Sequence, residues 1–131
     1  MSDTFGLKIG VEGEKEFKES LREINQNFKI LASEMTLVAS AFDKNEKSVQ
    51  SLSARISILN KEIDAQKDKV STLEKALCNA TVSFGENDKR TQSWAIQLNK
   101  AKAELNGMER ELSNNEKTMH NVSRGYNDAG K

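Results

Sequence analysis

Apolar residues recur along this chain at alternating spacings of four and three residues. The pattern starts at Phe17, and a single frame carries it to Tyr126. This heptad spacing places the apolar side chains on one stripe of an α-helix, and the stripe is buried when a second helix packs against it. The predicted interaction seam consists of Phe17, Leu21, Ile24, Phe28, Leu31, Met35, Val38, Phe42, Val49, Leu52, Ile56, Leu59, Ile63, Val70, Leu73, Leu77, Phe84, Trp94, Leu98, Leu105, Met108 and Leu112.

The composition is typical of long solvated helices. Charged residues make up 31% of the 131 residues, aromatic residues only 5%, and proline is absent. This profile predicts an all-α fold in which long helices form a coiled coil or a helical hairpin.

One short N-terminal segment departs from the heptad pattern. Leu7, Ile9 and Val11 alternate with Lys, Gly and Glu, and Gly13 follows as a break. Strict alternation predicts a short β-strand. A strand of this length needs a neighbour for its ladder hydrogen bonds, so we expect it to pair with another copy or another protein.

A stretch of twelve residues occurs twice. The block A-F-D-K-N-E-K-S-V-Q-S-L at residues 41–52 returns as S-F-G-E-N-D-K-R-T-Q-S-W at residues 83–94. The offset between the two copies is 42 residues, or six heptads, so the apolar frame survives both of them.

Both copies are predicted to be helix starts. Asn45 and Asn87 can each accept a hydrogen bond from a free backbone N–H of a first helical turn, and the acid that follows faces the positive end of the helix dipole. Gly85 can take the left-handed conformation that ends a helix. The unbroken frame fits one continuous helix as well as an antiparallel hairpin, and we slightly prefer a hairpin that turns at Gly85.

The expected organisation follows from these breaks. Ala32, Leu37, Ala39 and Ala41 widen the apolar face of the first helix, which indicates a further neighbour or a docking site there. The expected segments are a strand and linker over 1–13, a first helix over 14–42, a second coiled-coil helix over 43–84, a turn over 85–88, a third helix over 89–124 and a frayed tail over 125–131.

The seam favours self-association but leaves the helix orientation open. In its middle part β-branched residues alternate with leucine, which favours parallel two-stranded packing. The flanking charges can be satisfied in either orientation, and such exposed pairs are weak. Gln66 lies inside the seam and is predicted to fix its register. We expect a homo-oligomer formed through the coiled coil.

No pattern for catalysis or cofactor binding is present in the sequence. Twenty Lys and Arg residues balance twenty Asp and Glu residues, so no long-range field favours nucleic acid. The single His120 and the single Cys78 fall at polar positions of the frame, so we expect no metal site, no cofactor and no enzyme activity. Trp94 is predicted to pack in the core rather than to anchor a partner. No apolar run reaches the length of a membrane span.

Four blocks of the sequence closely resemble the N-terminal region of tail tape measure proteins from phages and prophages of Gram-positive bacteria. The blocks are L-K-I-G-V-E-G-E-K-E-F-K-E-S-L-R-E-I-N, F-D-K-N-E-K-S-V, L-N-K-E-I-D-A-Q-K and S-F-G-E-N-D-K-R-T-Q-S-W. The resemblance covers nearly the whole chain. Members of that family are normally several times longer, so we expect either an N-terminal piece of a longer protein or a short relic reading frame.

The resemblance implies a structural protein of long-tailed phage assembly. Such proteins are largely helical, act as the template that sets tail length, and have tail tube subunits and assembly chaperones as partners. The implied locations are the host cytoplasm during assembly and the lumen of the virion tail. No catalytic residues carry over, and a free-standing coiled-coil adaptor or holdase-like helical hairpin is the alternative function.

Overall fold

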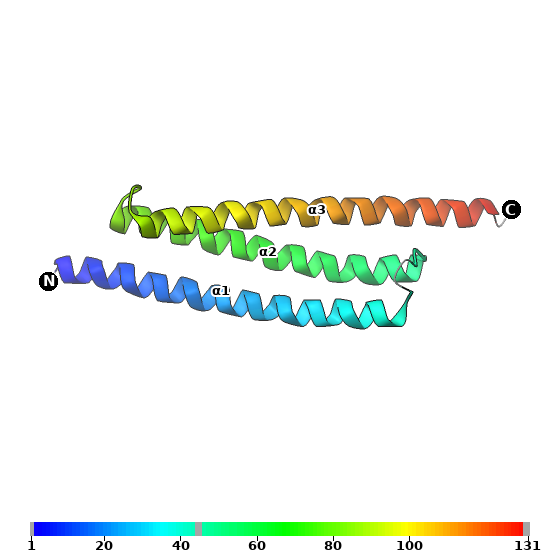
Figure 1. Ribbon diagram of the computed structural model, residues 1–131, viewed down its shortest axis with the longest axis horizontal. Coiled ribbons are helices and arrows are strands. Elements are labelled where there is room, and N and C mark those ends of the chain that lie inside the picture. The colour runs from blue at the N-terminus through cyan, green and yellow to red at the C-terminus, as the bar shows by residue number, and fades with distance from the viewer. Residues whose placement is uncertain (1, 44–45, 130–131) are drawn as a thin grey trace.

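The chain folds into three long helices that lie side by side. The computed structural model describes the backbone of residues 2–43 and 46–129, and the side chains of residues 13–43 and 46–124. Helix α1 spans Ser2–Ala41, α2 spans Val49–Phe84 and α3 spans Lys89–Ala129. Figure 1 shows the chain running back and forth along one long axis, with its two ends at opposite ends of the molecule. The predicted all-α class is confirmed.

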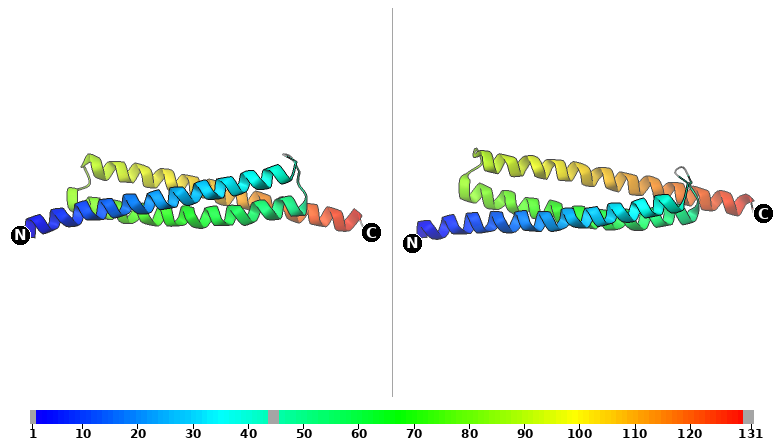
Figure 2. Two further views of the ribbon diagram at one scale, coloured as in Figure 1. Left: turned by 90° about the horizontal axis from the view of Figure 1, so that it is seen from below. Right: turned by 60° about the horizontal axis from the view of Figure 1, so that its bottom comes forward.

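Helix α2 is the central helix of the three. It packs against α1 on one side and against α3 on the other. Among the described residues, the backbones of α1 and α3 do not contact each other. Figures 1 and 2 show α2 beside both helices. Successive helices run antiparallel because the connections between them are short.

The expected N-terminal strand is not found. Residues 7–11 belong to α1, which begins at Ser2, and no strand occurs among the described residues. A helix satisfies its own backbone hydrogen bonds through i to i−4 pairs, whereas a lone strand has no ladder partner within the chain. The backbone therefore stays helical despite the alternating residue pattern.

Helix α2 begins later than the expected boundary at residue 43. Its N-cap is Ser48, whose side chain accepts a hydrogen bond from the backbone N–H of Ser51 at 3.2 Å. A backbone bond from Glu46 N–H to the Asp43 carbonyl, 2.9 Å long, forms a turn before it. The N-cap of α2 is therefore Ser48 and not Asn45 as predicted. Asn45 itself lies outside the described residues.

The turn between α2 and α3 occupies residues 85–88. Gly85 has a φ of 92°, which favours glycine, and its N–H donates to the Thr81 carbonyl at 2.9 Å. The cap predicted for Asn87 falls one residue later, because Asp88 Oδ1 accepts the backbone N–H of Arg90 at 2.8 Å. Helix α3 then continues to Ala129, so the tail expected to fray from residue 125 is helical up to that point.

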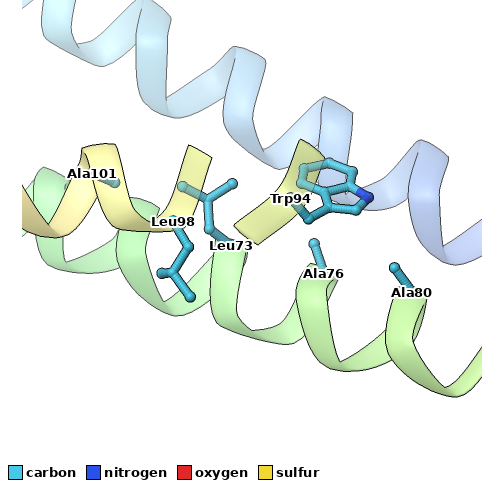
Figure 3. Close-up of a cluster of buried hydrophobic side chains, with 6 residues drawn as sticks. All are labelled: Leu73, Ala76, Ala80, Trp94, Leu98 and Ala101. Atoms are coloured by element: carbon cyan, nitrogen blue, oxygen red, sulfur yellow. The ribbon is translucent and has the colours of Figure 1, made fainter. Parts of the chain in front are cut away.

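The interior consists of two clusters at different places along α2. The cluster nearer the Gly85 turn contains Trp94, Leu98 and Ala101 of α3 packed on α2, with Phe17 and Leu21 of α1 against it. Figure 3 shows the indole of Trp94 lying over two alanines of α2, which leave room for it. The cluster nearer the other end joins only α1 and α2, through Leu31, Ile58 and Ala65 with Phe28, Met35 and Val38.

Candidate helix-docking surfaces

The structure places the predicted seam mainly on the inner faces of the helices. Val49 is the exception, since 39% of it is exposed at the start of α2. The fully buried seam residues are Leu31, Leu52, Leu59, Ile63, Leu73, Trp94 and Leu98. The half-buried seam residues are Phe17, Leu21, Ile24, Phe28, Met35, Val38, Phe42, Ile56, Val70, Leu77, Phe84, Leu105, Met108 and Leu112.

A second buried stripe on α2 lies outside the predicted seam. Ser51, Ile58 and Ala65 are buried, and they recur every seven residues on a face that the seam does not include. Ile58 and Ala65 pack with Leu31 of α1. A single seam accounts for one neighbour, whereas the central helix has two. The seven-residue recurrence of these three residues was the available signal for the second stripe.

Gln66 links α2 to α3 in the interior. Its side chain is 1% exposed, and its Nε2 donates a 2.9 Å hydrogen bond to the Ala101 carbonyl. A buried amide loses its bonds to water, so it is tolerated where a protein acceptor replaces them. The bond selects one alignment of the two helices, which is the physical requirement for a register-fixing residue.

The outward side of α1 carries an uncharged patch, which we call the outer α1 face. All eight exposed residues between positions 30 and 41 lack charge, in a chain in which 31% of residues are charged. Ile30 is 53% exposed and Leu37 is 70% exposed. The eight residues are Ile30, Ala32, Ser33, Thr36, Leu37, Ala39, Ser40 and Ala41.

The hydroxyl groups of this face donate to the helix that carries them. Ser33 donates to the Ile30 carbonyl at 2.8 Å, and Ser40 donates to the Leu37 carbonyl at 2.7 Å. Thr36 makes the same kind of bond to the Ala32 carbonyl at 3.0 Å, four residues back. These hydroxyl groups keep their hydrogen bonds when water is displaced from the outer α1 face. Burying them under another helix therefore has a smaller desolvation cost than burying hydroxyl groups without a protein acceptor.

A groove of about 740 Å³ lies between α1 and α3 near the Gly85 turn. Its lining comes only from these two helices, and its apolar part is formed by Leu21 and Trp94. Phe17 meets Trp94 edge-on, with ring centroids 6.5 Å apart, and so joins α1 to α3 beside the groove. We call this feature the α1–α3 groove.

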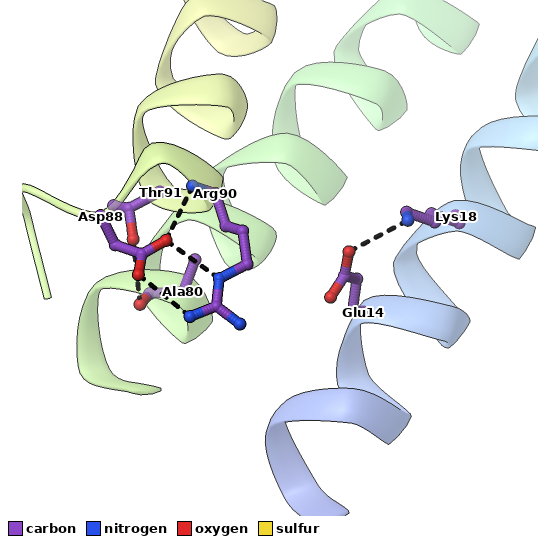
Figure 4. Close-up of polar contacts among 6 residues, drawn as sticks. All are labelled: Glu14, Lys18, Ala80, Asp88, Arg90 and Thr91. Atoms are coloured by element: carbon purple, nitrogen blue, oxygen red, sulfur yellow. Dashed lines mark hydrogen bonds and ion pairs between the residues drawn. The ribbon is translucent and has the colours of Figure 1, made fainter. Parts of the chain in front are cut away.

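Arg90 is held in place at the mouth of the α1–α3 groove. Its guanidinium forms two bonds with Asp88, of 2.9 and 3.0 Å, and its central carbon lies 3.6 Å from the ring centroid of Phe84. The side-chain and backbone hydrogen bonds from Arg90 lower the pKa of Asp88 to about 2. Figure 4 shows the guanidinium turned towards Asp88, while Glu14 on α1 pairs with Lys18.

Two acidic side chains come close to each other across α2 and α3. Burial raises the pKa of Glu62, and the charge of Glu111 raises it further. Glu62 is half-buried on α2, whereas Glu111 is exposed on α3. The pair is therefore a local electrostatic cost at this position of α2.

The residues that could carry reactive chemistry lie on the surface. Cys78 and His120 are exposed, and the described part of the chain contains no group of His, Cys, Asp or Glu residues suited to hold a metal ion. None of the described helices includes a stretch that is long and apolar enough to cross a membrane.

No family model, no curated protein and no solved structure matches this chain. The surfaces that the three helices leave uncovered are therefore the features from which its function is inferred. They are the outer α1 face and the α1–α3 groove.

Proposed function

We propose that this chain is a structural protein that works by packing against other helices, and that it associates with further copies of itself. The outer α1 face is the observation that carries this proposal. An isolated exposed leucine is ordinary on a protein surface. On a strongly charged chain, however, eight uncharged exposed positions within residues 30–41, where the one acid, Glu34, pairs with Lys61 of α2, form a helix face suited to burial.

The energetics favour contact between helices at this face. Fully burying one exposed Leu or Ile side chain contributes about 1.5 to 3 kcal/mol. Ile30 and Leu37 together therefore supply a substantial part of a moderate association energy, and the alanines and serines around them allow a second helix to approach closely.

We propose further that this association serves phage tail assembly, as a segment of a tape measure protein. The four sequence blocks that resemble that family support the proposal, and a long, narrow array of helices is compatible with a place inside a tube. The alternative, a free-standing adaptor or holdase-like protein, would use the same outer α1 face on different partners.

Self-association is tested with Leu37→Glu, and Ile96→Glu is the matched control. Ile96 is 68% exposed on α3 and lies outside the outer α1 face. Sedimentation velocity over a range of protein concentrations should show oligomers for the wild type and for Ile96→Glu, and a monomer for Leu37→Glu. A wild-type monomer throughout that range, or equal loss in both variants, would contradict the proposal.

The tail role is tested in the phage or prophage whose genome encodes this chain. Purified tails should contain its peptides by mass spectrometry, and cross-linking should join lysines of this segment to tube subunits. If the reading frame lies outside a cluster of tail genes and purified tails lack these peptides, the tail role is wrong. In that case a self-association that depends on Leu37 would still support the adaptor alternative.

A further inference from the structure

We propose that the α1–α3 groove is a docking site for an acidic amphipathic helix of another protein. This site is separate from the outer α1 face, and the proposal does not depend on a role in phage tails. It rests on the shape of the groove, on its apolar residues and on the charges that surround it.

The shape of the groove suits a helix. The backbones of α1 and α3 both pack on α2 and do not contact each other, and the α1–α3 groove between them is where a fourth helix would complete a bundle. The α1 lining runs from Glu14 to Lys29, a length of about 22 Å at the helical rise, which corresponds to about four turns of a docked helix.

The apolar residues lie along the middle of the groove. Leu21 is half-buried, and Trp94 contributes to the lining although most of its surface is already covered. Phe17 and Trp94 form an edge-on aromatic contact that joins the two walls and holds them in place. A docked helix would therefore meet an apolar contact formed by Leu21 and the exposed edge of Trp94, with polar and charged lining residues around it, as amphipathic helices do in the grooves that bind them.

The charges around the strip select the chemistry of the helix. Four of the eleven lining residues are cations, namely Lys18, Arg22, Lys29 and Arg90, and Glu14 is the single acid. The chain as a whole has no net charge, so this balance is a local property. The remaining lining residues besides Leu21 and Trp94 are uncharged and polar, and they can form hydrogen bonds with a carboxylate-rich partner.

Some of these cations already contact acids of the same helix or turn. Lys18 lies 3.0 Å from Glu14, as Figure 4 shows, and Arg22 lies 3.7 Å from Glu19. Both pairs are at least partly exposed and contribute little on their own, so they exchange readily with a docked carboxylate. Lys29 makes no ion pair with any described residue, so the end of the groove near Arg22 and Lys29 is its most cationic part.

Trp94 makes the proposal directly measurable, because it is the single tryptophan of the chain and lines the groove. The probe is a synthetic helical peptide with leucine at its a and d positions and glutamate at the flanking positions. It is titrated into the full chain while the fluorescence of Trp94 is recorded. A peptide with lysine in place of every glutamate is the charge control, and a short single-stranded DNA tests for general polyanion binding.

The groove variant is Arg22→Glu combined with Lys29→Glu. The matched variant is Lys100→Glu combined with Arg110→Glu, which changes the net charge equally at exposed positions of α3 outside the groove. Circular dichroism before titration checks that both variants fold. We expect saturable binding of the acidic peptide to the wild type, a loss of affinity on the order of tenfold in the groove variant, and a change below about twofold in the matched variant.

Several outcomes would overturn the proposal. The first is that the acidic peptide causes no saturable change in Trp94 fluorescence. The second is that both double variants lose the same affinity for the acidic peptide. The third is that the lysine peptide or the DNA binds the wild type as tightly as the acidic peptide does. A loss of self-association in the groove variant would identify a second copy as the occupant instead. Leu37→Glu should leave peptide binding unchanged, so failure of the groove proposal and failure of the proposed self-association are distinguishable.

Discussion

The two copies of the repeated block form the two ends of the helical array, and they differ in how many helices they join. Both copies make the same backbone turn: Glu46 N–H donates to the Asp43 carbonyl, and Asp88 N–H donates to the Gly85 carbonyl at the matching positions. Both copies also end in a buried residue, Leu52 in the first and Trp94 in the second.

Packing separates the two ends. Trp94 reaches residues of all three helices through its cluster and through the aromatic contact with Phe17. At the Leu52 end the buried cluster joins only α1 and α2, and the outer α1 face stays exposed. Similar local sequence therefore builds the same turn twice, whereas the buried cluster near the turn joins three helices at the Trp94 end and two at the Leu52 end.

The largest expected difference between the ends comes from removing these two side chains. Trp94→Ala should reduce the free energy of unfolding by about 3 to 5 kcal/mol, because it leaves a cavity where three helices meet. Leu52→Ala lies in the range of about 2 to 5 kcal/mol for a buried leucine and should cost less than Trp94→Ala, because a smaller side chain is removed. Urea denaturation followed by circular dichroism measures both values. Equal costs would mean that the two ends do not differ in the way described.

The next largest effect concerns Gln66, which lies between the two ends. Gln66→Ala should cost about 2 kcal/mol, since it removes both the bond to the Ala101 carbonyl and side-chain volume. Gln66→Leu keeps most of the volume and should cost less. The same urea titrations apply, and equal costs for the two variants would show that the lost hydrogen bond outweighs the lost volume.

The two helix caps should act locally at their own ends. Ser48→Ala should destabilise the protein by about 1 kcal/mol and speed hydrogen exchange of the first-turn amides of α2. Asp88→Ala should speed exchange of the first-turn amides of α3, including that of Arg90. Exchange measured by NMR resolves the two sites. Faster exchange at both ends in either variant would show that the ends unfold together.

Acid should weaken the Gly85 end through Asp88. Its pKa is lowered to about 2 in the folded chain, so the ionised carboxylate contributes stability that is fully present above about pH 3.8. That contribution is lost as the pH falls through about 2. The difference in thermal midpoint between wild type and Asp88→Asn should accordingly shrink as the pH falls through this window. A difference that stays constant would show that the Asp88 carboxylate is not the source of the acid-dependent loss of stability.

The smallest expected effect is a gain in stability from Glu62→Gln. Folding raises the pKa of the Glu62 carboxyl above its ordinary value near 4.5. The protonated carboxyl therefore contributes stability that is fully present below about pH 4.5 and is lost as the pH rises through the raised pKa. The variant should thus melt slightly higher than the wild type at neutral pH and equally at low pH. Glu104→Gln, at an exposed site on α3, is the control and should change little.

The sequence predicts the helical class well because heptad spacing is a local property of the chain. The alternation at Leu7, Ile9 and Val11 misleads because it reports the preference of side chains, whereas the backbone needs a pairing partner to become a strand. Similarly, the cap positions differ from Asn45 and Asn87 because several polar residues in each block can cap, and loop geometry selects among them.

The candidate docking surfaces could be predicted only in part. The wide apolar face of the first helix is visible in the sequence at Ala32, Leu37, Ala39 and Ala41, but their exposure depends on which side of α1 meets α2. The α1–α3 groove places Arg22 and Lys29 in one lining with Arg90, more than 60 residues away in sequence, and no local pattern relates them.

The sequence by itself determined the helices, the polar surface and the repeated turns, since each depends on residues within a few positions of one another. The tertiary structure alone decided that α2 has two neighbours, which buries Ser51, Ile58 and Ala65 as well as the seam. It also decided that the backbones of α1 and α3 do not contact each other. One heptad seam accounts for a single partner, so the second neighbour of α2 and the second buried stripe follow only from the packing of whole helices.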